Sequence, residues 1–314
     1  MEETQEILEL GAIQESSTPS KKDDFLATMS DLYVKFKGID FPVIVHDNEC
    51  LEYTANEFQV RDDDVFNVTY PKSGTIWMQE ILTLIHSNGD TEVAQSIPNW
   101  DRVPWIEQKT GRGHLEKRPS PRLITTHLSA HLAPKSLFSS KAKVIYTVRN
   151  PRDVFVSLYF FSHSISFIET PKSFDDFFQK FLKGDVVYGS WFDHIKSWLG
   201  VKSKINIMFQ TFEDMKKDPR GSVVKICQFL EKDLDEKAID SVVQNSSFKT
   251  MKENKMSNWS LVPEQMLNPN IPFMRKGVSG DWRNHFSKEQ IELFDATYKE
   301  QMKDVDMKFS WDSL

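Results

Sequence analysis

The chain has 314 residues, of which 39% are hydrophobic and 27% are charged, values typical of one large α/β domain. Its net charge of -7 argues against a general affinity for nucleic acids or anionic membranes. No stretch approaches the roughly 20 apolar residues of a membrane span, and the first residues lack the pattern of a signal peptide. Two cysteines, Cys50 and Cys227, give no disulfide framework, so we expect a cytoplasmic protein.

The sequence divides into a polar start and one long globular part. Residues 1–24 predict a flexible N-terminal tail, residues 25–314 predict a single domain, and residues 36–45 predict a turn with a short hairpin. Short apolar runs predict strands at residues 65–69, 123–126, 144–148 and 205–209. Helical periodicity predicts helices at residues 77–86, 154–161, 173–182, 191–199, 221–230, 236–245 and 287–302. Because three of the strands lead into a helical pattern, we expect an α/β fold with a central, mostly parallel sheet flanked by helices.

Residues 69–77 connect the first of these strands to its helix. A strand, a turn of small residues and a helix expose a row of backbone N–H groups at the helix N-terminus, where the helix dipole favours an anion. Gly74 lets a ligand approach closely, Ser73 and Thr75 add hydroxyl groups, and Lys72 adds a mobile cation. This stretch therefore predicts an anion-binding turn rather than an ordinary strand–helix connection.

A nucleoside triphosphate P-loop is an alternative interpretation of this turn. The pattern G-x-x-x-x-G-K-[ST] is absent, because Lys72 precedes the glycine instead of following it. No obvious acidic residue ends a neighbouring predicted strand, where a kinase would hold Mg²⁺. A nucleoside or nucleotide kinase is therefore the second hypothesis, and a non-catalytic lipid or nucleotide carrier is the third.

Three separate motifs of the chain resemble one enzyme family. Residues 69–77 (TYPKSGTIW) are similar to the 5′-phosphosulfate-binding loop of the cytosolic sulfotransferases, and residues 149–161 (RNPRDVFVSLYFF) and 273–282 (FMRKGVSGDW) are similar to two later motifs. The resemblance runs from about residue 25 to the C-terminus and is closest to the hydroxysteroid (alcohol) branch. It implies a P-loop-like turn and transfer of a sulfuryl group from 3′-phosphoadenosine 5′-phosphosulfate (PAPS), which leaves adenosine 3′,5′-bisphosphate (PAP).

The resemblance also implies which residues bind the two anionic ends of PAPS. The phosphosulfate would lie against Lys72, Ser73, Gly74, Thr75, Ile76 and Trp77. The 3′-phosphate would be held by Arg149, Ser157, Arg275, Lys276 and Gly277. Taken without the resemblance, an ion pair with Asp153 is the alternative role of Arg149, and the Arg275-Lys276 pair could be ordinary surface.

The adenine end of the nucleotide has its own expected residues. The resemblance places Trp77, Phe212, Ser246 and Met251 around the base. Aromatic faces stack on a purine, and Phe212 stands where a tyrosine is expected, so stacking would remain while a hydroxyl contact is lost. Each position taken alone would more often belong to the core.

His127 is the best candidate among eight histidines for a general base. It directly follows the strand at residues 123–126, which places it at the edge of the sheet where ligands bind. An imidazole with an ordinary pKa of about 6.5 can take a proton from an attacking alcohol. The resemblance also points to His127, assigns Lys72 to the charge on the departing oxygen, and suggests that Ser157 holds Lys72 aside. We expect His131 and His194 to be structural.

The acceptor site should be apolar, and the resemblance places Trp105, Phe161, Ile165 and Trp259 in it beside His127. Ordinary core packing is the alternative for each of these side chains. Thr125 supports the hydroxysteroid branch, because the resembling phenol-directed enzymes tend to carry lysine at this position; a phenol remains the alternative acceptor. No histidine pair has metal-ligand spacing with cysteines or carboxylates, so we predict no metal.

Residues 283–292 match the C-terminal dimer motif K-x-x-x-T-V-x-x-x-E of the family only in part. Arg283 and Glu292 keep the charges at the two ends, whereas Ser287 and Lys288 occupy its small apolar centre. The lysine opposes the apolar contact on which a homodimer through this motif would depend.

Overall fold

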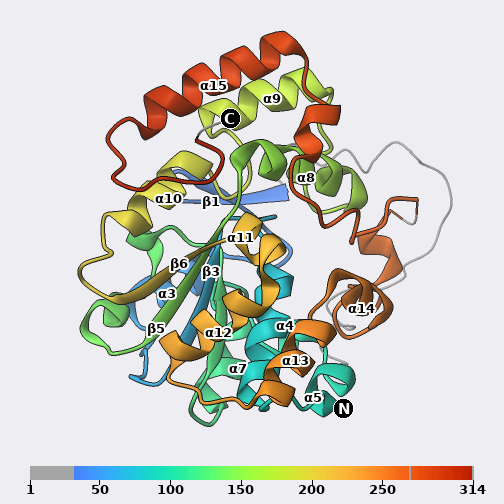
Figure 1. Cartoon of the computed structure of the whole chain (residues 1–314). Coiled ribbons are helices and arrows are strands. Elements are labelled where there is room, and N and C mark those ends of the chain that lie inside the picture. The colour runs from blue at the N-terminus through green and yellow to red at the C-terminus, as the bar shows by residue number, and fades with distance from the viewer. Residues whose placement is uncertain (1–31, 269, 313–314) are drawn as a thin grey trace, which may run out of the picture.

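The structure is a computed structural model that describes residues 32–268 and 270–312, so the predicted tail lies outside the described residues. Its centre is a parallel sheet in the order β4-β3-β5-β6 with helices on both faces (Figure 1). The strands are β3 (Val65–Thr69), β4 (Leu123–Thr126), β5 (Lys143–Val148) and β6 (Asn206–Thr211). The four predicted strands and the parallel α/β fold are confirmed. The predicted hairpin is present as β1 (Tyr33–Phe36) and β2 (Ile39–Pro42).

The helices predicted from periodicity are also present. They are α4 (Thr75–His86), α8 (Pro151–Ser164), α9 (Phe174–Lys183), α10 (Trp191–Leu199), α12 (Pro219–Leu230), α13 (Glu236–Asn245) and α15 (Lys288–Met302). Ser173 caps α9, and Ser287 with Gln290 forms a capping box at the start of α15. Shorter helices that the sequence did not predict are α3 (Asn48–Asn56), α5 (Glu92–Ser96), α6 (Asn99–Arg102), α7 (Gly111–Lys117), α11 (Phe212–Lys217) and α14 (Phe248–Glu253).

The strands β3, β4 and most of β5 are buried, which explains the apolar residues in each of them. In β3, Phe66 and Val68 point into a core formed with α8, α9, α10 and α15. Val65, in contrast, packs with α4, α12 and α13 on the opposite face. Figure 1 shows α4, α12 and α13 together on one side and α9 beside α15 on the other. The strands run in parallel, so their carboxyl ends and the polar residues that follow them meet at one edge.

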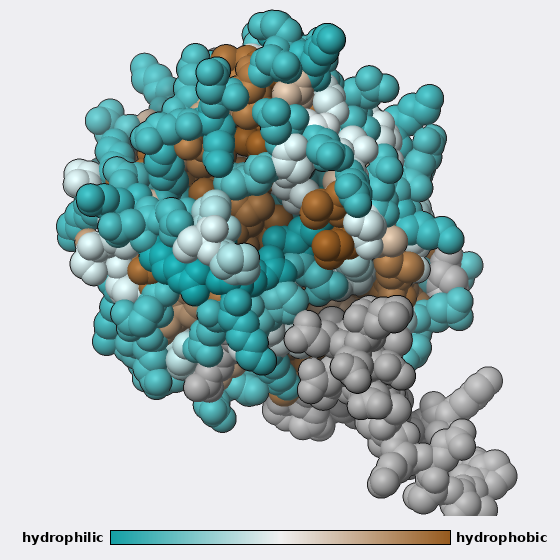
Figure 2. Space-filling view, turned by 90° about the horizontal axis from the view of Figure 1, so that it is seen from below, coloured by the Kyte–Doolittle hydropathy of each residue, from teal (hydrophilic) through white to brown (hydrophobic). Residues whose placement is uncertain are grey.

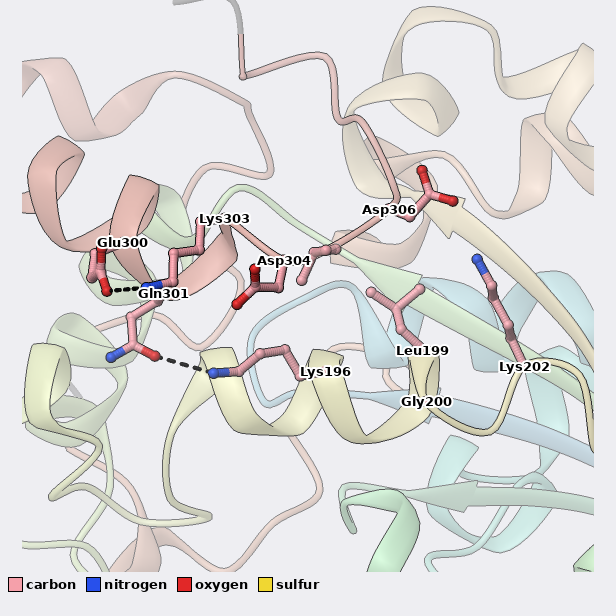
Figure 3. Close-up of a pocket in the computed structure, with 10 residues that line it drawn as sticks. Lys196, Leu199, Gly200, Lys202, Glu300, Gln301, Lys303, Asp304 and Asp306 are labelled. Atoms are coloured by element: carbon pink, nitrogen blue, oxygen red, sulfur yellow. Dashed lines mark hydrogen bonds and ion pairs between the residues drawn. The ribbon is translucent and has the colours of Figure 1, made fainter.

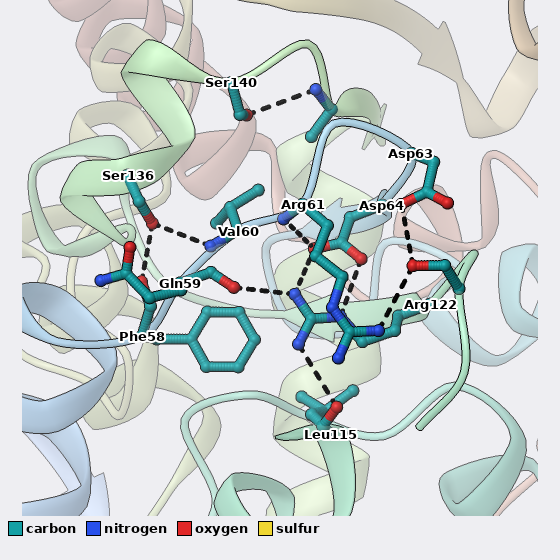
Figure 4. A network of polar contacts seen from close by, with 12 residues as sticks. Phe58, Gln59, Val60, Arg61, Asp63, Asp64, Leu115, Arg122, Ser136 and Ser140 are labelled. Atoms are coloured by element: carbon teal, nitrogen blue, oxygen red, sulfur yellow. Dashed lines mark hydrogen bonds and ion pairs between the residues drawn. The ribbon is translucent and has the colours of Figure 1, made fainter. Parts of the chain in front are cut away.

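A buried ion pair fixes the opposite edge of the sheet, where β3 and β4 begin (Figure 4). Arg122 donates from Nε to Asp64 Oδ1 at 2.8 Å and from Nη2 to Asp64 Oδ2 at 2.5 Å. Arg122 also donates to the carbonyl groups of Gln59 and Leu115. The two charged side chains are almost inaccessible, at 2% and 0% exposure. The geometry satisfies both charges, so removing either partner would leave an uncompensated buried ion.

We therefore expect Arg122→Met to lower the free energy of unfolding by about 3–5 kcal/mol, because Asp64 would keep its burial and lose its counter-ion. Urea unfolding followed by circular dichroism measures this loss. Glu300→Gln is the matched control, since it breaks the exposed Lys303–Glu300 pair and should cost at most about 1 kcal/mol. Equal losses in the two variants would contradict the structural role of the Arg122–Asp64 pair.

The face of the molecule seen from below carries mainly hydrophilic residues with smaller hydrophobic patches between them (Figure 2). Among the described helices, none combines the length and the apolar character that crossing a bilayer would require.

Candidate active site

The predicted anion-binding turn lies at the carboxyl end of β3, in the middle of the sheet. Lys72 and Gly74 have left-handed backbone conformations, with φ of 70° and 103°. A Cβ atom on Gly74 would lie 3.0 Å from the ring of Phe212, so both the backbone and the packing require glycine. No side chain caps the N-terminus of α4, and the buried Ser73 hydroxyl has no partner among the described residues. The turn therefore retains unpaired donors suited to an anion.

The next residues of the predicted loop form the first turn of α4. Thr75 and Thr69 share a hydrogen bond between their hydroxyl groups at 2.7 Å, which closes the loop over the end of β3. Ile76 and Trp77 follow in the helix and are partly buried. The loop is thus held by contacts of its own, before any ligand is considered.

Arg149 joins the turn to the loop at residues 273–282. Its Nη1 donates to the carbonyl of Lys72 at 2.9 Å, and its Nη2 donates to the carbonyl of Val278 at 3.0 Å. The alternative of an Arg149–Asp153 ion pair is wrong, since Asp153 instead accepts from the backbone N–H groups of residues 280 and 282. The Nε of Arg149 is buried without a partner among the described residues. Arg149 therefore orders two loops and keeps one donor unused.

Lys72, Arg149 and Arg275 lie close enough for their charges to interact. Burial, with the nearby charges of Arg149 and Arg275, lowers the pKa of Lys72 to about 7. The ammonium group of Lys72 lies 3.9 Å from the ring centre of Phe161 and 4.8 Å from that of Phe273. The three cations therefore form a positively charged region that an anion would stabilise.

Ser157 lies two turns into α8 and is half-buried. The suggested contact between Ser157 and Lys72 is absent from the hydrogen bonds of the described residues, because the Lys72 ammonium lies against Phe161 and Phe273 instead. In this structure, aromatic rings rather than the serine hydroxyl hold the lysine.

Two of the four residues predicted around the adenine line a cavity of about 150 Å³. Trp77 and Ser246 line it, and the ring centre of Phe212 lies 5.3 Å from that of Trp77. Met251 is buried nearby in α14 but does not line the cavity. Sequence reasoning missed Phe248, which lines the cavity and packs on Gly277.

Gly277 has a left-handed φ of 62°, and a Cβ atom there would lie 2.2 Å from the ring of Phe248. Its neighbours Arg275 and Lys276 both pair with Asp281, at 2.7 Å each. Close packing on Phe248 therefore requires glycine in this loop and connects the cationic pair with the cavity that Phe248 lines.

His127 lies at the carboxyl end of β4, next to the turn. Its Nδ1 lies 2.8 Å from the backbone carbonyl of Thr69, an atom that can only accept, so Nδ1 carries the hydrogen and Nε2 is the free base. Burial, reinforced by the charge of Lys72 and opposed by the bond to Thr69, lowers the pKa of His127 to about 4. The imidazole is consequently neutral at physiological pH and able to take a proton.

A buried carboxyl group, Glu107, holds the backbone of His127. Its Oε1 accepts the His127 N–H at 2.8 Å, while its Oε2 has no partner among the described residues. Glu107 is fully buried, and burial raises the pKa of its carboxyl to about 7. His194, buried with both ring nitrogens bonded, donates to the His127 carbonyl at 3.1 Å. Sequence reasoning missed Glu107, whose only signal is an acidic residue ending an apolar run.

One predicted acceptor residue, Trp105, has a ring contact with this histidine, and Tyr188, which was not predicted, has another. The ring of Trp105 lies 5.9 Å from that of His127, and the ring of Tyr188 lies 5.3 Å away on another side. Tyr188 also packs in a cluster with Ile165 and Phe161.

Ring contacts also connect Phe161 with the loop at residues 273–282. Phe161 lies 5.7 Å from Phe273, which stacks on Trp259 at 4.2 Å. The four predicted residues therefore belong to one apolar region that extends from the base to the cationic turn.

Thr125 is fully buried and does not face that region. Its hydroxyl accepts from Gln79 Nε2 at 2.9 Å and donates to the Val103 carbonyl at 2.8 Å. Its structural role is to join β4 to α4 and to the segment that carries Trp105.

A second cleft lies away from these residues. With a volume of about 590 Å³, it lies between the end of α10 and the segment after α15 (Figure 3). Two of its lysines are already bound, Lys196 to Gln301 and Lys303 to Glu300. None of the predicted site residues lines this cleft. In the part of the chain that the structure describes, no three His, Cys, Asp or Glu side chains gather as a metal would require.

Comparisons with known proteins agree with this geometry. The sulfotransferase domain family matches residues 62–306. Human sulfotransferase 2A1 is 48% identical over 285 residues, which cover 90% of this chain and 100% of that protein. The 3-beta-hydroxysteroid sulfotransferase of Cavia porcellus is also 48% identical over 285 residues, which cover 90% of this chain and 99% of that protein. The crystal structure of mouse sulfotransferase SULT7A1 complexed with PAP superposes with a TM-score of 0.73 at 33% identity, covering 88% of this chain and 96% of that one. The chain belongs to the sulfotransferase family.

Proposed function

We propose that this protein transfers the sulfuryl group of PAPS to a hydroxyl group of a small apolar acceptor of the hydroxysteroid type. The observation that carries this proposal is the place of Thr69, which contacts His127 and leads into the Lys72 turn. The Thr69 carbonyl fixes the tautomer of His127, and Thr69 leads directly into the Lys72 turn. A base for the acceptor and a cation for the departing group are therefore adjacent.

The residues present fit a nucleotide with two anionic ends. The Ser73 hydroxyl and the uncapped N-terminus of α4 are free to bind the phosphosulfate beside Lys72. Arg149 has an unpaired Nε, which suits the 3′-phosphate together with Arg275 and Lys276. Between them, Trp77, Phe212, Ser246 and Met251 would receive the adenine, with PAP as the product left in the site.

PAPS, when bound, supplies a sulfuryl group on a phosphate leaving group. The Nε2 of His127 removes the proton from the acceptor hydroxyl, because Nδ1 is already engaged with Thr69. Lys72 and the N–H groups of the turn stabilise negative charge on the departing oxygen. We propose that Ser157 contacts the 3′-phosphate from α8 and restrains Lys72 once the lysine leaves the aromatic rings.

The acceptor is proposed to lie against Trp105, Phe161, Ile165 and Trp259. Desolvation of a rigid apolar ligand by these side chains would supply most of its affinity. The name of one relative, 3-beta-hydroxysteroid sulfotransferase, supports a hydroxysteroid, and the buried Thr125 contributes no cation of its own to the site. A phenol is the second candidate acceptor.

Labelled PAPS incubated with a hydroxysteroid, a simple alcohol and a phenol tests the proposal. We expect sulfated steroid to form without added metal. Mg²⁺-dependent turnover of ATP would favour a kinase instead, and binding without any transfer would favour a carrier.

Two further properties belong to this proposal. The two buried cysteines, Cys50 and Cys227, form no disulfide with each other, which supports a reducing, cytoplasmic location. A homodimer through residues 283–292 would have to use a segment in which Ser287 caps α15 and Lys288 is its first residue. Analytical ultracentrifugation with the charge-reversal variant Glu292→Lys would test that route.

A further inference from the structure

One carboxylate, that of Asp281, gathers the cations of the proposed phosphate site. Its Oδ2 pairs with Arg275 Nη1 at 2.7 Å, and its Oδ1 pairs with Lys276 Nζ at 2.7 Å. Asn284 Nδ2 and His285 Nε2 also contact it, at 3.0 and 3.2 Å. The Asp281 side chain is only 4% exposed. Such a saturated, buried carboxylate holds the long side chains around it in defined positions.

The position of Asp281 is itself fixed from α8. Asp153, which is buried in the first turn of that helix, accepts the backbone N–H of Gly280 at 2.7 Å and that of Trp282 at 3.1 Å. These two bonds hold the backbone on both sides of Asp281. Since α8 begins just after Arg149, the same helix supports Arg149 and the loop that carries Arg275 and Lys276.

The ion pairs leave most donors of the two cations unused. A guanidinium has five N–H groups and an ammonium has three, and Asp281 engages only one nitrogen of Arg275. Arg275 and Lys276 are 22% and 46% exposed, so they reach the surface while Asp281 lies beneath them. The ring of Phe160 supports the Arg275 guanidinium at 4.6 Å. Two cations over one carboxylate keep a net positive charge for a ligand.

We propose that Asp281 is a positioning residue that holds Arg275 and Lys276 for the 3′-phosphate and thereby sets the preference for a 3′-phosphorylated nucleotide. This inference rests on the proposed function. Asp281 does not touch the nucleotide. It acts through the two cations, removing the rotamer freedom that they would otherwise lose on binding.

Calorimetric titration of the full chain with PAP and with adenosine 5′-monophosphate tests this role. In Asp281→Asn, PAP affinity should fall at least about tenfold, a loss of about 1.4 kcal/mol, because the cations lose their charged anchor. Affinity for adenosine 5′-monophosphate, which lacks the 3′-phosphate, should change by less than about twofold. Asp281→Glu, which keeps the charge, should recover part of the preference.

Asp295→Asn is the matched control, since it removes the carboxylate that pairs with Arg152 elsewhere and should leave both affinities unchanged. Equal losses for the two nucleotides in Asp281→Asn would reduce Asp281 to a structural residue. Unchanged or tighter PAP binding in Asp281→Asn would overturn the positioning role alone. Failure of the wild type to bind PAP would overturn the proposed function as well.

Discussion

Replacing His127 by alanine should lower kcat by about 10²–10⁴-fold, the range by which a positioned general base accelerates proton transfer. The hydrogen bond to the Thr69 carbonyl occupies Nδ1 of His127, so Nε2 is the ring nitrogen that can accept the proton. PAP affinity should stay close to that of the wild type, because the cationic residues keep their contacts. Single-turnover kinetics with saturating PAPS and a steroid acceptor, together with PAP titration, measure the two quantities.

His131→Ala is the matched control for this experiment. His131 lies four residues further on, is exposed, and contacts only Ser129 in the described hydrogen bonds. Near-normal turnover in His127→Ala, or an equal loss in both variants, would remove His127 from the role of base.

Replacing Lys72 by methionine should reduce kcat by about 10²–10³-fold, the usual cost of removing one group that stabilises developing charge. PAP affinity should fall as well, because the phosphate end loses a cation. Methionine keeps much of the volume between Phe161 and Phe273, so the variant tests charge rather than packing. Lys303→Met removes an exposed lysine and should change neither quantity.

The pH dependence of PAP binding follows from the same lysine. The pKa of Lys72 is lowered to about 7, and a bound anion favours the protonated form, so binding takes up a proton above that pH. Wild-type affinity should therefore be nearly constant below about pH 7 and weaken by up to about tenfold per unit above it. Calorimetry between pH 6 and 9 measures this slope. An equal slope in Lys72→Met would show that another group titrates.

The fold could be predicted because its strands are buried on both faces and its long helices have one apolar side. Val65, Phe66 and Val68 show why, since a short, mostly apolar run that is buried along its whole length suits a central parallel strand. Short helices such as α5 and α6 escaped prediction, because four or five residues cannot show a helical period. Tertiary contacts, not local pattern, decide that those segments are helical.

Lys72, Arg149, Arg275 and His127 could be singled out from the sequence because each follows a strand or belongs to a motif. Glu107, Asp281 and Phe273 escaped prediction for a different reason. Glu107 acts on His127 through a backbone N–H, and Phe273 contacts Lys72 only after the chain has folded. Asp281 is an ordinary loop aspartate until Arg275 and Lys276 are placed beside it. These contacts depend on which residues lie close together in the folded chain, and the spacing of residues along the sequence does not predict that.

The pairing of β3 with β4 has a consequence for how this enzyme could diversify. Val68 pairs with Thr126, so the residues that follow them, Thr69 and His127, meet through strand register. A slip by one residue would turn the imidazole to the other face. The aromatic residues at positions 259 and 273, by contrast, lie outside the strands. Under the proposed function, substitutions in these loops would change acceptor choice, while the strand register would keep His127 beside Thr69.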